Sequence, residues 1–311
     1  MRVLVDTDPG LGYKFADVDD GLAIFLMLNN PEFEIEGFTT IFGNTPVDKG
    51  FLLLRKYLKL AKRLDIPHIK GAQSKNELGK LNDASNFLIN KVKEHPKELI
   101  LITLGPLTNV ATALINYPDF FDDLKQIVIM GGTLSPQTEF SGLFKGIDRR
   151  FFDKIKIKEI VAEFNFYNDA KAAKTVIEAQ TSTQRIEMGL DICCKAIFKD
   201  KHLKEIEEIQ EPIQQFIAKH LKFWLKIWKL NGKGGFFPFD TFCPIYLLKP
   251  KLFKHVDLFL EVDAEKIEGK LKIVPKGNKK STPISYCVNF TDIYAKKEFM
   301  EILISNLKGD L

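Results

Sequence analysis

Residues 6–24 read DTDPGLGYKFADVDDGLAI, and they follow directly on the short apolar run RVLV at 2–5. The stretch carries five aspartates, although the apolar segments on either side of it have the composition of buried structure. Like charges that are held close together repel, and a carboxylate that leaves water is costly unless a cation compensates it. The stretch therefore predicts a positively charged partner at the end of a buried strand.

Short apolar runs alternate with longer helical patterns over residues 2–132. The predicted strands cover 2–5, 33–43, 98–105 and 126–132, and the predicted helices cover 20–30, 47–64, 84–95 and 107–117. This alternation predicts an α/β fold with a mostly parallel, doubly wound central sheet and helices on both faces. Such sheets bind ligands outside the carboxyl ends of their strands, where the corners DTDPG, FGN, TLGPLTN and IMGG lie.

The second half of the chain is less regular. A long connection, an inserted loop or lid, is expected over 134–160, and a long amphipathic helical pattern covers 201–230. The remaining predicted strands are RIEMGLDI, VDLFLEV, KLKIVP and SYCVNF, and the last predicted helix runs through FMEILISNL. No repeat or Pro/Ser-rich linker divides the chain, so we expect one domain over 1–311.

Composition and charge exclude several classes of protein. Apolar residues make up 45% and charged residues 28%, which is typical of a folded globular chain. The net charge of +4 is too dilute for a dedicated nucleic-acid protein, and no apolar run reaches ~18 residues. The N-terminus enters a strand directly, and the cysteines form neither a metal-ligand spacing nor a disulfide framework. We therefore expect a cytoplasmic protein with no nucleic-acid or membrane partner.

The aspartates have a structural explanation that covers only some of them. A cluster of aspartates in a loop is often a solvated turn, and Asp19 and Asp20 open a predicted helix, where carboxylates favour the positive end of the dipole. Asp8 is different, because Pro9-Gly10 fixes it at the strand end. Carboxylate oxygens suit Ca²⁺ or Mg²⁺ better than Zn²⁺. The sequence thus predicts a hard divalent cation.

Two chemistries use an Asp-x-Asp strand end together with such an ion. In phosphatases of the haloacid-dehalogenase type the first Asp attacks phosphorus, and a Lys and a second acidic pair follow later in the chain. That later set is not found here. The other chemistry is hydrolysis at C1′ of a ribose, where an Asp deprotonates the attacking water and the sugar passes through an oxocarbenium-like state.

Six motifs occur in an order that resembles the inosine-uridine preferring nucleoside hydrolase family. The opening pattern Asp-x-Asp-Pro-Gly followed by Asp-Asp is matched by residues 6–10 and 19–20. The later matches are Gly43-Asn44, LGPLTNVA at 104–111, MGG at 130–132, AEFN at 162–165 and Asp240. The resemblance implies a single-domain nucleoside-hydrolase fold and cleavage of ribonucleosides, as in purine and pyrimidine salvage.

The resemblance also implies roles for particular residues. Asp8, Asp20, Asp240 and the main-chain carbonyl of Leu104 would bind Ca²⁺, and Asp8 would also be the general base. The ribose hydroxyls would be held by five residues: Asp19, Asn44, Glu163, Asn165 and Asp240. Because family members are commonly dimers or tetramers, the resemblance implies a homodimer or homotetramer.

The sequence departs from the family at three places. Well-studied members have His before the last aspartate, where it can protonate the leaving base, and this chain has Phe239, which would contact the base instead. The loop before Asp19 is long, so a register that uses Asp17 in place of Asp19 stays open. A family Asn falls on Ile157, in a segment made basic by Arg149, Arg150, Lys154, Lys156 and Lys158. Such a segment is either a solvated face or a site for a phosphate on a larger substrate.

Three functions are compatible with these residues. The first is a calcium-dependent ribonucleoside hydrolase that gives free base and ribose. The second keeps the ion and the ribose and cleaves a modified nucleoside or another N-ribosyl compound. The third, suggested by Phe239, is a ribosyl-binding protein without turnover.

Overall fold

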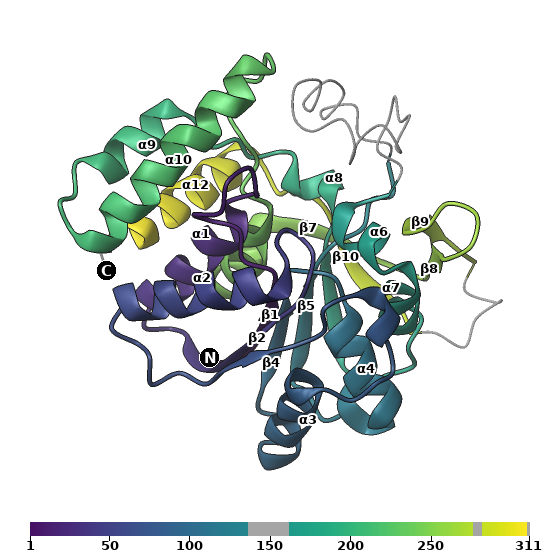
Figure 1. The fold of residues 1–311 in the computed structure, drawn as a ribbon. Coiled ribbons are helices and arrows are strands. Elements are labelled where there is room, and N and C mark those ends of the chain that lie inside the picture. Colours follow the sequence, from purple (N-terminus) through teal and green to yellow (C-terminus); the bar gives the residue numbers. More distant parts are fainter. Residues whose placement is uncertain (136–161, 276–281, 310–311) are drawn as a thin grey trace.

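β1 (Arg2–Thr7) lies inside the central sheet of the computed structural model, which describes residues 1–135, 162–275 and 282–309. Among these residues, eight strands form the central sheet in the order β3-β2-β1-β4-β5-β6-β10-β7 (Figure 1). Only the pairing of β10 with β7 is antiparallel. The other strands are β2 (Glu34–Thr40), β3 (His68–Lys70), β4 (Ile100–Thr103), β5 (Gln126–Met130), β6 (Gln184–Met188), β7 (Phe253–Leu258) and β10 (Ile284–Phe290).

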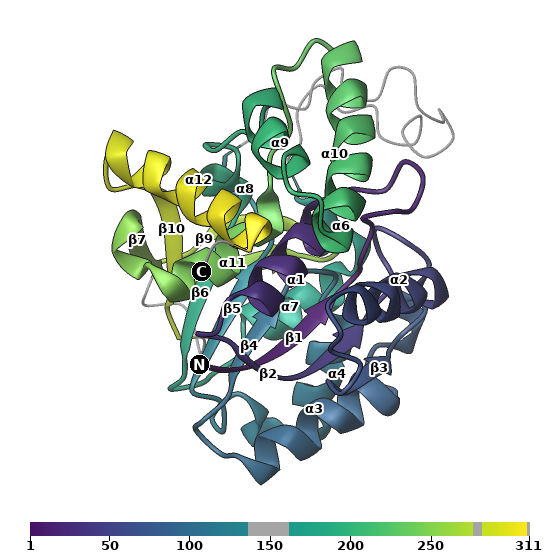
Figure 2. The ribbon, with the colours of Figure 1, turned by 90° about the vertical axis from the view of Figure 1, so that its left-hand side faces the viewer.

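Helices cover both faces of this sheet. Neighbouring residues of β1 point into different cores, since Val3 and Val5 belong to one apolar cluster and Leu4 to the other. The first cluster is covered by α1 (Asp19–Asn29), α2 (Val47–Leu60), α8 (Leu190–Cys193), α9 (Asp200–Glu207), α10 (Pro212–Leu230), α11 (Phe242–Leu248) and α12 (Ile293–Lys308). The second is covered by α3 (Asp83–Glu94), α4 (Thr108–Asn116) and α7 (Ala170–Ile177), with α6 (Phe164–Asn168) beside them (Figures 1 and 2). The expected mostly parallel, doubly wound α/β sheet is confirmed.

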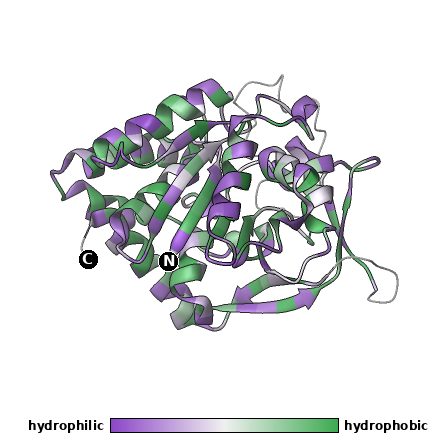
Figure 3. Ribbon diagram, turned by 90° about the horizontal axis from the view of Figure 1, so that it is seen from below, coloured by the Kyte–Doolittle hydropathy of each residue, from purple (hydrophilic) through white to green (hydrophobic). Residues whose placement is uncertain are grey.

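α1 is buried on all sides, whereas the outer helices bury one side. In α2 the buried positions are Val47, Gly50, Leu54, Tyr57 and Leu58, which is the spacing of one helical face. Figure 3 shows the same mixture of hydrophobic and hydrophilic residues along the helices around the sheet. No helix of the described residues has both the length and the apolar character needed to cross a membrane.

The order of the strands reverses next to β1. From β1 the chain first adds β2 and β3 on one side, and then crosses to β4, β5 and β6 on the other. Parallel sheets bind ligands where the strand order reverses in this way, outside the carboxyl ends of the strands. The residues that follow Thr7 and Thr103 therefore lie at the point where ligands bind in such sheets.

The structure corrects two predicted strands. VDLFLEV is not one strand, because its first part lies in β7 and its last part forms β8 (Leu260–Asp263), which pairs with β9 (Lys270–Ile273) in a separate two-stranded sheet. RIEMGLDI leaves the sheet after Met188, and its last residues form α8. Both errors arise because an apolar run does not reveal where the chain turns.

Part of the sequence-based interpretation falls outside the described residues. The expected loop or lid at 134–160 is covered only at its first two residues. Ile157 and the five basic residues between Arg149 and Lys158 also lie outside the described ranges, so both explanations of that segment stay predictions.

Candidate active site

Four buried aspartates meet at the carboxyl end of β1. Asp8 follows the strand, Asp19 and Asp20 form the first turn of α1, and Asp240 lies in a one-turn 3-10 helix, Phe239–Thr241. Carboxylate oxygens of Asp19, Asp20 and Asp240 lie within 4.8 Å of one another. Segments that are more than 200 residues apart in the chain thus form one acidic site.

Asp8 is closely confined. Its Oδ2 accepts a 2.6 Å hydrogen bond from the backbone N–H of Asn44. A Cβ at Gly43 would lie 2.1 Å from Oδ2, and a Cβ at Gly105 would lie 2.7 Å from Oδ1. Two glycines at the ends of neighbouring strands therefore leave space for this carboxylate alone, and its orientation is set by the backbone.

Asp20 is held by donors from β1 and from the residue next to Asp8. Its Oδ1 accepts hydrogen bonds from Thr7 Oγ1 at 2.5 Å and from the Asp8 N–H at 3.2 Å. Its Oδ2 accepts a longer bond, 3.3 Å, from Asn44 Nδ2. Asn44 therefore donates to both Asp8 and Asp20, and it links the segment after β2 to the start of α1.

The electrostatics of the site call for a cation. Burial is the largest effect that raises the pKa of each of the four carboxyls, and neighbouring aspartates raise the pKa of Asp8, Asp19 and Asp240 further. Within the described part of the chain, no lysine or arginine forms an ion pair with any of them. Buried carboxylates with no basic partner fit a hard divalent metal ion, which prefers oxygen ligands.

Leu104 offers a main-chain oxygen at the end of β4. Asn165 Nδ2 donates to this oxygen at 2.9 Å and lies 3.3 Å from the carbonyl oxygen of Met130. A carbonyl oxygen has two lone pairs, so the bond from Asn165 leaves one for a further partner. The same contact fixes the amide of Asn165 against the ends of β4 and β5.

Glu163 is the N-cap of α6 and is buried. Its carboxylate accepts hydrogen bonds from three backbone N–H groups, those of Asn165 at 2.8 Å and of Phe166 and Gly132 at 3.1 Å. Burial raises its pKa to about 7, although these backbone donors act in the opposite direction. Glu163 and Asn165, which were predicted together, therefore belong to one rigid turn.

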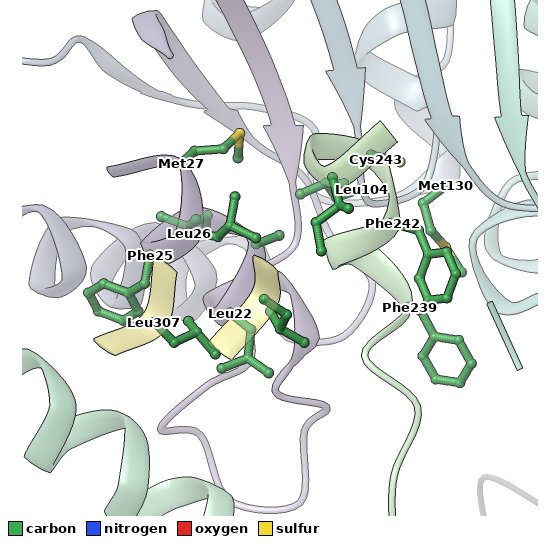
Figure 4. Close-up of a cluster of buried hydrophobic side chains, with 14 of the residues drawn as sticks. Leu22, Phe25, Leu26, Met27, Leu104, Met130, Phe239, Phe242, Cys243 and Leu307 are labelled. Atoms are coloured by element: carbon green, nitrogen blue, oxygen red, sulfur yellow. The ribbon is translucent and has the colours of Figure 1, made fainter. Parts of the chain in front are cut away.

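Phe239 stands beside Asp240 and is buried in the apolar cluster that contains Met130 and Phe242 (Figure 4). Its ring centroid lies 5.7 Å from that of Phe237, which in turn lies 5.5 Å from Trp228 of α10. A row of aromatic rings thus extends from the acidic site to α10.

Asp17 occupies a different position from Asp19. Its backbone N–H donates to Asn44 Oδ1 at 2.8 Å, and its own Oδ1 accepts from the N–H of Val18 at 2.7 Å. Like Asp8, it lies outside the group formed by Asp19, Asp20 and Asp240, but unlike Asp8 and Asp19 it is only partly buried. The geometry thus favours the register in which Asp19 contacts the site.

Two residues beneath the site received no role from the sequence. Asp6 is fully buried, and its Oδ1 accepts hydrogen bonds from Thr39 Oγ1 at 2.6 Å and from Asn109 Nδ2 at 2.9 Å. Asn109 also accepts from the N–H of Ala72 at 3.0 Å. Asp6 and Asn109 both lie inside matched motifs, so the sequence could have drawn attention to them. Their hydrogen-bond partners could not be predicted, because these partners are distant in the chain.

Comparisons with known proteins agree with this picture. Residues 3–295 match the family model described as inosine-uridine preferring nucleoside hydrolase. A pyrimidine-specific ribonucleoside hydrolase of Salmonella arizonae is 28% identical over 99% of this chain and 98% of its own length. A probable uridine nucleosidase of Oryza sativa is 27% identical over 90% and 86%.

Solved structures share the fold. A purine-preferring ribonucleoside hydrolase from Gardnerella vaginalis superposes with a TM-score of 0.81 at 21% identity and covers 99% of both chains. A plant nucleoside hydrolase superposes with a TM-score of 0.80 at 22% identity, over 99% of this chain and 98% of its own.

Fold, site and relatives together define an enzyme that hydrolyses N-glycosidic bonds of ribonucleosides. The chain belongs to the inosine-uridine preferring nucleoside hydrolase family.

Proposed function

We propose that this nucleoside hydrolase depends on calcium and releases free base and ribose. The observation that carries the proposal is the meeting of four buried aspartates from β1, α1 and the 239–241 turn without an ion pair to a described lysine or arginine. Because Ca²⁺ accepts roughly 6 to 8 oxygens in flexible geometry, such a site suits it better than an ion of strict geometry.

The calcium ligands would be Asp8, Asp20, Asp240 and the carbonyl oxygen of Leu104. All three carboxyls are buried, Asp20 is hydrogen-bonded to the backbone of Asp8, and the Leu104 oxygen keeps a lone pair beside its bond from Asn165. When bound, the ion would make a water more acidic and fix the ribose diol. Asp19, whose carboxylate lies within 4.8 Å of those of Asp20 and Asp240, would be nearest to those hydroxyls.

Asp8 would act as the general base that removes a proton from the water attacking C1′. The bond from the Asn44 N–H and the two adjacent glycines hold its carboxylate in one orientation, which is what a base in a fixed attack geometry requires. Asp19, Asn44, Glu163, Asn165 and Asp240 would bind the ribose hydroxyls. Orienting C1′ in this way can lower a barrier by about 7 to 11 kcal/mol in favourable cases.

Phe239 would place an aromatic surface where the leaving base departs. General acid catalysis is worth about 10² to 10⁴ in rate, and a phenyl ring cannot supply it. This observation favours a second candidate substrate, a modified nucleoside or other N-ribosyl compound whose aglycone leaves without protonation. Release of base and ribose from either substrate fits a salvage role, and the family resemblance favours a homodimer or homotetramer.

A substrate panel tests the proposal. Uridine, cytidine, inosine, adenosine, guanosine and p-nitrophenyl riboside are assayed with calcium and with a chelator, for the wild type and for Asp8→Asn. We expect calcium-dependent hydrolysis and a loss of about 10² to 10⁴ in kcat for the variant. Asp122→Asn is the matched control, because Asp122 precedes β5 and is hydrogen-bonded to the turn before β6, at the opposite end of these strands from the site. Equal rates for Asp8→Asn and the wild type would overturn the assignment of the base.

A further inference from the structure

We infer that Asp191 is a positioning residue for the sugar-binding end of the site, acting on Glu163 through the backbone of residues 132–135. The inference rests on the proposed function, since it takes Glu163 to be a ligand of the ribose hydroxyls. Asp191 lies in α8, just beyond the end of β6, and no role was predicted for it from the sequence.

Asp191 collects donors from two separate elements. The backbone N–H groups of Leu134 and Ser135 donate to its carboxylate at 2.9 and 3.2 Å. The phenol of Tyr286, a buried residue of β10, donates at 2.5 Å to the same oxygen as Leu134. Hydrogen bonds to a charged acceptor are roughly twice as strong as neutral ones, so this carboxylate fixes the chain where it leaves β5.

The segment that Asp191 fixes is hydrogen-bonded to Glu163 through the neighbouring residue Gly132. Gly132 precedes it, and the N–H of Gly132 donates to Glu163 at 3.1 Å while its carbonyl accepts from the N–H of Leu190 at 3.0 Å. Gly132 has φ +72°, a left-handed conformation that a side chain would disfavour. α8 therefore holds this turn at two points, through the backbone of Leu190 and the carboxylate of Asp191.

Gly132 has little free space around it, so a small shift of its backbone would disturb its neighbours. A Cβ at this residue would lie 2.5 Å from Oε1 of Glu187, a fully buried carboxyl whose two oxygens have no hydrogen-bond partner in the described structure. A shift of the turn would bring Gly132 against this group or remove one of the three donors of Glu163. Misplacement by about 1 Å in an active site can cost roughly 10²-fold in rate.

Asp122, in the loop before β5, provides a matched control at the other end of the sheet. Its carboxylate accepts from Thr181 Oγ1 at 2.8 Å and from the N–H of Ser182 at 2.9 Å, so it also ties down a turn with hydroxyl and backbone donors. That turn precedes β6, at the opposite end of the strand from Asp191. A purely structural effect of losing such a carboxylate should therefore appear in both variants.

The test compares Asp191→Asn, Tyr286→Phe and Asp122→Asn in the full chain with calcium present. Ribose affinity is measured by calorimetry, KM and kcat with p-nitrophenyl riboside, and Tm by calorimetric unfolding. We expect Asp191→Asn to weaken ribose binding and raise KM at least tenfold, Tyr286→Phe to act in the same direction by a smaller factor, and Asp122→Asn to change only Tm. Unchanged ribose affinity in both Asp191→Asn and Tyr286→Phe would overturn the inference.

Glu163→Gln separates this inference from the proposed function. If Glu163→Gln leaves ribose affinity unchanged, the proposed role of Glu163 is wrong, and the inference falls with it. If Glu163→Gln weakens ribose binding while Asp191→Asn does not, only the positioning role is wrong. Should Asp191→Asn fail to fold, Tyr286→Phe alone decides, because it removes one donor and leaves the charge of Asp191 in place.

Discussion

The backbone N–H of Asn44 donates a 2.6 Å hydrogen bond to Oδ2 of Asp8, so the end of β2 sets the orientation of the carboxylate that follows β1. The two strands are parallel neighbours, and Thr40 lies opposite Thr7. The backbone that follows the neighbouring strand therefore sets the orientation of the carboxylate that we propose as the general base. A small change in the backbone around Asp8 should then affect catalysis more than folding.

Gly105→Ala tests this dependence. The new Cβ would lie 2.7 Å from Asp8 Oδ1, so the carboxylate must move, and we expect kcat to fall by about 10²-fold. Gly234→Ala is the matched control, because a Cβ there meets nothing within 4 Å. Steady-state kinetics of the two variants check the prediction. Similar kcat values for both would show that the orientation of Asp8 is unimportant.

Asp240→Asn should have opposite effects on stability with and without calcium. In chelated protein the variant removes one of several buried like charges, so we expect a higher Tm than for the wild type. Calcium at 100 times its Kd should stabilise the wild type by about 2.7 kcal/mol, and this gain should largely disappear in the variant. Scanning calorimetry with calcium and with chelator measures both. An equal calcium effect on the two proteins would contradict the ligand assignment.

Phe239→His should change the substrates that the enzyme can use. An imidazole beside Asp240 could protonate a departing base, so we expect kcat on ordinary nucleosides to rise by about 10²-fold or more. Hydrolysis of p-nitrophenyl riboside, whose leaving group needs no proton, should not improve. Phe239→Leu is the control for loss of the ring alone. A rise for both substrates, or for neither, would argue against a missing general acid.

His202 should contribute measurably to the pH dependence of the free energy of unfolding. Burial, together with Lys201 and Lys199, lowers its pKa from 6.5 to about 4, and its Nδ1 accepts from the N–H of Lys199. Between these values the unfolded chain binds the proton and the folded chain does not, so this contribution is complete above pH 6.5 and lost by about pH 4. His202→Gln should remove at most about 3 kcal/mol of that pH dependence.

The measurement is the difference between the two unfolding profiles. The buried aspartates have raised pKa values, so their contribution to stability falls as pH rises and runs opposite to that of His202. They are common to both proteins and cancel in the difference. Denaturant unfolding at pH 4 to 7.5 gives both curves, and parallel curves would contradict the assignment.

Much of the fold could be predicted because its signals are local. The strand 2–5 followed by the helix from Asp20 corresponds to β1 and α1, since apolar runs and helical periodicity are properties of neighbouring residues. The split of VDLFLEV between two sheets could not be predicted, because an edge strand and a hairpin strand have the same composition. Only contacts with distant partners decide between them.

The matched motifs drew attention to the residues of the candidate site, and the roles of these residues stay predictions. The structure brings the carboxylate oxygens of Asp19, Asp20 and Asp240 within 4.8 Å of one another, and Asp8 is near enough to raise the pKa of Asp240. Asp191 gave no such signal, because its partners at 134 and 286 are far away in the chain. Positioning residues of this kind become visible only when the hydrogen bonds are known.

A crystal structure of the protein grown with calcium and ribose would test the central claim most directly. We predict one ion at the acidic site, at roughly 2.3–2.6 Å from carboxylate oxygens of Asp8, Asp20 and Asp240 and from the carbonyl oxygen of Leu104, with two ribose hydroxyls on the same ion. An ion held without Asp8, or ribose bound with no ion in contact with these residues, would contradict the account.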